Sequence, residues 1–71
     1  MRGNPQALGP SLPHLGLERV QWVRIMADRT GTRYEVVGVG HRRPIVRTVP
    51  VRTAAALIAA GVPAVRFPPA A

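Results

Sequence analysis

The sequence has no cysteine, so neither a disulfide nor a cysteine-based metal site is available to it. Its longest uninterrupted apolar run, residues 54–60, is far shorter than the roughly 20 residues that cross a bilayer as a helix. Prolines near the N-terminus interrupt the sequence before the apolar region of a secretory signal forms. The absence of a membrane span and of a secretory signal predicts a cytoplasmic protein with no membrane partner, whereas the absence of cysteine favours neither compartment.

Lysine is also absent, and acidic residues are scarce. All ten basic residues are arginines, against three acidic residues, and the formal net charge is +7. The planar guanidinium binds two phosphate oxygens at once, so this balance favours a nucleic-acid partner. A GC-rich genome also favours arginine over lysine, but this explains the shortage of acids less well. Solubility, or contact with an acidic protein, is the alternative use of the charge.

Side chains for catalysis are few. The acids are Glu18, Asp28 and Glu35, and the two histidines, His14 and His41, lie apart in the sequence. No spacing indicates a metal site or a catalytic pair, although His41 with Glu35 is one conceivable acid–base combination. Residues 38–40, GVG, begin like a phosphate-binding loop but have neither a third glycine nor a following helix. The sequence therefore predicts a non-enzymatic protein with no catalytic residue, no metal or other cofactor, and no small-molecule substrate.

Seventy-one residues predict one domain with a thin core, since a chain of this size buries only about 60% of its unfolded surface. Self-association or docking into a larger assembly is a common remedy. Residues 1–17 are rich in proline and glycine and show no periodicity, which predicts an extended or disordered arm. The single domain is expected over residues 18–67, followed by a tail over 68–71.

Two strands are predicted over residues 19–28 and 32–39, with a turn at 28–31 between them. Alternation places Val20, Trp22, Arg24, Met26, Arg33, Glu35, Val37 and Val39 on one face, and Gln21, Val23, Ile25, Ala27, Thr32, Tyr34, Val36 and Gly38 on the other. Both faces are half apolar, so we expect both to be covered. Trp22 and Tyr34 fall on opposite faces and are interpreted as core residues, not as a stacking platform for bases.

A third strand, a helix and a last strand complete the prediction. β-Branched residues favour a strand from Ile45 that ends near Pro50. Thr53 fits an N-cap, residues 54–60 form a short apolar helix, and Gly61 fits its end. Residues 65–67 are either a fourth strand or irregular. The predicted fold is α+β, with a three- to four-stranded antiparallel sheet, one helix covered on all sides, and the order β-β-β-α-β.

The strongest functional cluster is the basic turn over residues 40–44, GHRRP, with the arginines near it. The first hypothesis is that nucleic-acid phosphates are bound by Arg29, Arg42, Arg43, Arg47 and Arg52. A regular meander would place the two turns at opposite ends and spread these arginines apart. The alternative is a protein-interaction or accessory subunit of a larger assembly, whose interface would be the apolar helix and the arm, through Leu57, Ile58, Leu12 and Leu15. Under both hypotheses we expect a homodimer or a subunit of an assembly.

Overall fold

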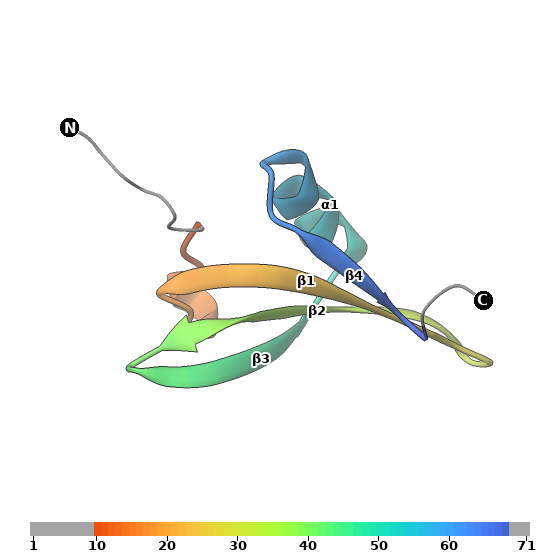
Figure 1. Ribbon diagram of the computed structural model, residues 1–71, viewed down its shortest axis with the longest axis horizontal. Coiled ribbons are helices and arrows are strands. Elements are labelled where there is room, and N and C mark those ends of the chain that lie inside the picture. Colours follow the sequence, from red (N-terminus) through yellow and green to blue (C-terminus); the bar gives the residue numbers. More distant parts are fainter. Residues whose placement is uncertain (1–9, 69–71) are drawn as a thin grey trace.

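The computed structural model describes residues 10–68. Its elements are the 3-10 helix η1 (Pro13–Leu15), the strands β1 (Arg19–Asp28), β2 (Gly31–Gly40) and β3 (Arg43–Val49), the helix α1 (Val51–Ala59) and the strand β4 (Ala64–Phe67) (Figure 1). The predicted α+β class and the order of strands and α-helix are confirmed. No helix within residues 10–68 is long and apolar enough to cross a membrane.

The four strands form one mixed sheet in the order β3-β2-β1-β4. β1 and β2 are antiparallel, as are β2 and β3, whereas β4 runs parallel to β1. The prediction of a wholly antiparallel sheet is therefore wrong for β4. A helix between two strands lets the chain cross the sheet and return in the same direction, and α1 carries the chain from the β3 edge to the β1 edge.

A β-bulge at Gln21 changes which side chains of β1 face the helix. Val20 pairs with Gly38 and Trp22 pairs with Val37, so Gln21 has no partner in β2. One extra residue reverses the alternation of side chains on its N-terminal side. Val20, predicted to share a face with Trp22, consequently lies on the opposite face and is buried. C-terminal to the bulge, the even-numbered residues of β1 share a face with the odd-numbered residues of β2, as predicted.

The core lies between α1 and one face of the sheet. Its buried side chains are Leu17, Val20, Val23, Val36, Val49, Ala54, Leu57 and Val62. α1 contributes Ala54 and Leu57, while its other side leaves Val51 58% and Ile58 40% exposed. The expectation that the apolar helix is covered on all sides is not met within the described residues.

The described part of the predicted N-terminal arm folds back over the end of β2. Leu12 and Leu17 exchange backbone hydrogen bonds, N to O, of 2.8 and 3.1 Å around η1. Leu17 is fully buried, and Leu12 and Leu15 pack against the core. A Cβ at Gly40 would fall on the carbonyl oxygen of Gly16, so the close approach requires glycine there. Residues 1–9 of that arm, and residues 69–71 of the predicted tail, lie outside the described residues.

α1 begins two residues before the predicted N-cap. Its N-cap is Pro50, which has an extended backbone at φ −67° and ψ 159°. No side-chain hydrogen bond caps this end of the helix. The carbonyl oxygen of Pro50 accepts hydrogen bonds from the amides of Thr53 at 3.0 Å and Ala54 at 3.2 Å. Thr53 therefore lies inside the first turn, because the fixed φ of proline already suits the entry into a helix. Gly61, at φ +100°, follows the helix end as predicted.

The face of the sheet turned away from α1 is called the open face. The strand register places on it Trp22, Arg24, Met26, Arg33, Glu35, Val37, Val39, Val46, Thr48, Val65 and Phe67. Both helices pack with the core residues of the other face, so no element within residues 10–68 covers this one. The open face is apolar over much of its surface, with Val46 and Val65 more than 40% exposed.

Candidate nucleic-acid interface

The five arginines predicted to bind nucleic acid are all exposed but do not form one cluster. Arg29 lies in the β1–β2 turn and Arg42 in the β2–β3 turn, at opposite ends of the sheet (Figure 1). Arg43 begins β3 and lies directly beside Arg42. Arg52 lies in the first turn of α1. The structure thus keeps Arg42 and Arg43 together and separates Arg29 from them.

Arg47 supports the fold locally. It pairs with Val36 across the strands, so its side chain lies on the helix side of the sheet. Nε of Arg47 donates to the carbonyl oxygen of Leu15 at 3.1 Å, and Nη1 donates to that of Val46 at 3.3 Å. The guanidinium therefore ties β3 to the η1 segment, which the sequence did not indicate.

The β2–β3 turn presents its side chains from an uncommon backbone conformation. Gly40 pairs with Arg43, so the turn has two central residues, His41 at φ +50° and Arg42 at φ +64°. Positive φ at both positions is the pattern of type I′ turns, which match the twist of a hairpin and usually carry asparagine and glycine. The tip of this hairpin instead carries an imidazole and a guanidinium.

Arg19 lies at the same end of the sheet. It pairs with Val39, and it lines with Glu18 and Arg42 a shallow hollow of about 290 Å³. We call Arg19, Arg42 and Arg43 the basic end. Within residues 10–68 only Arg24 and Arg33 form salt bridges with a carboxylate, so the basic end has none. Sequence reasoning missed Arg19, although a regular hairpin register continued from the β1–β2 turn places residue 19 opposite Gly40, at the same end of the sheet as the β2–β3 turn.

The open face carries an ion pair and an aromatic pair. Nε of Arg24 lies 2.7 Å from Oε1 of Glu35, and Nε of Arg33 lies 3.6 Å from Oε2 of the same carboxylate. The rings of Trp22 and Phe67 have centroids 6.1 Å apart and are tilted by 50°. Trp22 is thus not a core residue as predicted, because it lies half-buried on the face that no described helix covers.

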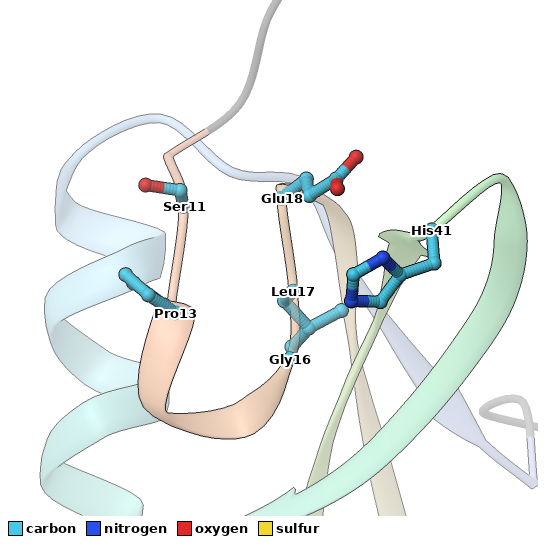
Figure 2. Close-up of a pocket in the computed structure, with 6 residues that line it drawn as sticks. All are labelled: Ser11, Pro13, Gly16, Leu17, Glu18 and His41. Carbon is cyan, nitrogen blue, oxygen red and sulfur yellow. The ribbon is translucent and has the colours of Figure 1, made fainter.

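A second cleft lies between η1 and the β2–β3 turn, with a volume of about 410 Å³. Figure 2 shows that the hydroxyl of Ser11 points away from the imidazole of His41. The cleft therefore holds no nucleophile oriented against a base. Glu35, the other conceivable partner of His41, is instead held by Arg24. Within residues 10–68 no three metal-ligating side chains come together.

The predicted protein interface is only partly at the surface. Leu57 is buried against the sheet, and Leu12 and Leu15 are half-buried against the core. Ile58 is the member of this set with a large exposed fraction. Exposed large apolar side chains lie on two surfaces of the described residues, with Val51 and Ile58 on the outer side of α1 and Val46 and Val65 on the open face of the sheet. Sequence reasoning expected both surfaces to be covered.

The β1–β2 turn is fixed by one carboxylate. Oδ1 of Asp28 accepts hydrogen bonds from the hydroxyl of Thr30 at 2.6 Å and from its amide at 2.8 Å. These bonds stabilise the ionised form, the one from the hydroxyl most strongly, and they lower the pKa of Asp28 below its usual value. Arg29 is held at the tip of this turn, far from the basic end.

Comparisons with protein families, with curated proteins and with solved structures found no match to this chain. Its function is therefore inferred from the surfaces described above. Two of them have a distinct chemistry: the basic end, which suits an anion, and the open face, which combines apolar, aromatic and guanidinium groups.

Proposed function

We propose that this protein is a small non-enzymatic nucleic-acid-binding protein that contacts phosphates through its basic end. The observation that carries the proposal is that Arg19, Arg42 and Arg43 lie at one end of the sheet and that none of the three forms a salt bridge with a carboxylate of residues 10–68. The strand register places Arg19 on the open face and Arg43 on the helix side, on either side of the turn that carries Arg42. Two of these arginines lie at a projecting hairpin turn. A phosphate approaching that end meets three guanidinium groups against one carboxylate, that of Glu18, which forms no salt bridge with them.

The charge of the whole chain supports the same partner. A net charge of +7 attracts a polyanion from a distance and raises the rate of encounter at low salt. Guanidinium groups then hold phosphate oxygens through paired N–H donors. Contacts of this kind position a nucleic acid without reading its sequence, so we expect affinity with little sequence preference.

The test is a binding titration of a labelled oligonucleotide at several salt concentrations. Each neutralised phosphate releases counterions, and three contacts predict a slope of log K against log salt of about −2 for a single strand and about −2.7 for a duplex. Raising salt from 50 to 200 mM should then weaken binding by about 15- to 40-fold. Affinity that does not change with salt would contradict phosphate contacts.

A pair of matched variants locates the site. Arg42→Asn removes one charge and keeps a residue that tolerates positive φ, whereas Arg66→Gln removes one charge from the exposed strand β4. We expect Arg42→Asn to weaken binding to all sequences and to reduce the salt slope by about 1, and Arg66→Gln to have a smaller effect. Equal effects of the two variants would show that only total charge matters.

A further inference from the structure

We infer that the open face binds single-stranded nucleic acid, with bases stacked on the Trp22–Phe67 pair and phosphates held by arginines toward both ends of the face. This inference rests on the proposed function and names the kind of nucleic acid that the protein takes. It also gives a role to the face that no described element covers.

The aromatic pair is the first support. Trp22 comes from β1 and Phe67 from β4, and their rings are in tilted contact on a sheet face that α1 does not cover. Rings on an exposed sheet face are the platform on which unpaired bases stack, since every base has an aromatic face. The position of β4 beside β1 places both rings on one face, where Phe67 is opposite Met26, four residues along β1 from Trp22, and the ring centroids lie 6.1 Å apart.

The arginines of the face are the second support. Arg24 and Arg33 share the single carboxylate of Glu35, so this group of three keeps a positive charge. The hydrogen bond of Arg24 to Glu35 uses Nε, and a guanidinium has four further N–H donors for a phosphate. Arg33 is the more exposed of the two, with half of its side chain accessible.

The distance along the sheet suits a short single strand. The basic end includes Arg19 at the start of β1, and Arg33 pairs with Met26 near the other end of the same strand. Arg19 and Met26 are seven residues apart along β1, a distance of about 23 Å. This length accommodates a few nucleotides, which is the lower end of the range of about 4–16 nucleotides for single-strand binding sites. Val37 and Val46, paired across β2 and β3, give the bases an apolar surface between the charged ends.

The charge of the chain favours a nucleic acid over a second copy of this chain on this face. A second copy would bring a further net charge of +7 against the arginines of the first, and like charges oppose such packing. A duplex buries the faces of its bases in its own stack, so it would reach the basic end but not the aromatic pair. The open face therefore predicts preference for a single strand over a duplex.

The test compares a labelled 12-nucleotide oligothymidylate with a duplex of equal length at 50 mM salt, using the full chain. Phe67→Leu keeps most of the apolar area but removes the aromatic face, and it should weaken binding of the single strand about five-fold or more while leaving duplex binding within two-fold. Phe67→Tyr should keep the affinity. Val51→Ala, at an exposed apolar position on α1, is the control for loss of apolar surface elsewhere. Circular dichroism of each variant confirms that it is folded.

The outcomes separate the two proposals. Binding of both oligonucleotides with equal affinity, unchanged by Phe67→Leu, would overturn this inference and leave the phosphate contacts of the basic end standing. Absence of binding to either oligonucleotide would overturn the proposed function and this inference with it. A concentration-dependent dimer in size-exclusion chromatography that is lost in Phe67→Leu would show that a second copy covers the open face, and would also overturn the inference.

Discussion

Leu17→Ala tests whether the segment N-terminal to β1 is part of the fold. Leu17 is fully buried among residues of β1, β2 and α1, although it precedes the first strand of the sheet. Removing a buried leucine side chain costs roughly 2–5 kcal/mol through lost burial and the cavity that remains. At about 0.05–0.15 kcal/mol per residue, a chain of this length has a free energy of unfolding of about 4–11 kcal/mol. The substitution should therefore remove a large part of the stability.

Urea denaturation followed by circular dichroism measures this loss. With an m-value of about 1 kcal/mol per M, a loss of 2 kcal/mol lowers the urea midpoint by about 2 M. Val51→Ala is the control, because that side chain is 58% exposed and surface substitutions usually change stability by less than about 0.5 kcal/mol. A midpoint for Leu17→Ala close to that of Val51→Ala would refute the placement of Leu17 in the core.

Two further predictions concern the contact of the N-terminal segment with β2 and the β1–β2 turn. In Gly40→Ala, the added Cβ would meet the carbonyl of Gly16 and lie 2.6 Å from Cδ1 of Ile45, so we expect a loss of about 1–3 kcal/mol in the free energy of unfolding. Each kcal/mol lost should lower the melting temperature by about 4–8 °C. An unchanged melting temperature would show that the two segments do not approach so closely. The carboxyl of Asp28, titrated by NMR, should show a pKa below its usual value, and Thr30→Val should raise the pKa toward that value by removing the stronger hydrogen bond. Since the pKa of Asp28 is lowered in the folded state, its stabilising effect should be complete above the unfolded pKa of about 4 and should be lost as the pH falls through the folded pKa. An identical pKa in Thr30→Val would contradict this account of the turn.

The local patterns of the sequence predicted most of the elements. Alternation of apolar residues located β1 and β2, and Gly61 located the end of the helix to within one residue, whereas the helix begins three residues before the predicted start at residue 54. Alternation also placed Arg24 and Glu35 on one face, where the structure pairs them. Each of these features depends on residues that are close in the sequence or joined by a short turn, which is why pattern reasoning reached them.

The features that were missed depend on contacts between distant segments. The parallel position of β4 follows from the path of α1 across the sheet, and no residue within β4 specifies it. The bulge at Gln21 moved Val20 to the core, although its sequence reads as a regular strand. The aromatic pair joins Trp22 to Phe67 across 44 intervening residues, so it could be recognised only once β4 was placed beside β1.

The candidate site was predicted in part. The basic turn was identified from its composition, and the expected separation of Arg29 from Arg42 is what the structure has. Arg47 was included for its charge, but its guanidinium contacts the carbonyl of Leu15, a partner that lies 32 residues away in the sequence. Composition indicates how many arginines a chain has, whereas the fold decides which of them meet at one end.

The fluorescence of Trp22, the only tryptophan of the chain, gives the most direct test of nucleic-acid binding. An oligothymidylate is titrated into the protein at 50 mM and at 200 mM salt while the emission of Trp22 is followed. We expect saturable quenching at the lower salt, from bases stacked on the ring, and an affinity at least about 15-fold weaker at the higher salt, from three or more phosphate contacts. Emission that stays constant in excess oligonucleotide at 50 mM salt would contradict stacking on Trp22, and an affinity that does not change with salt would contradict the phosphate contacts.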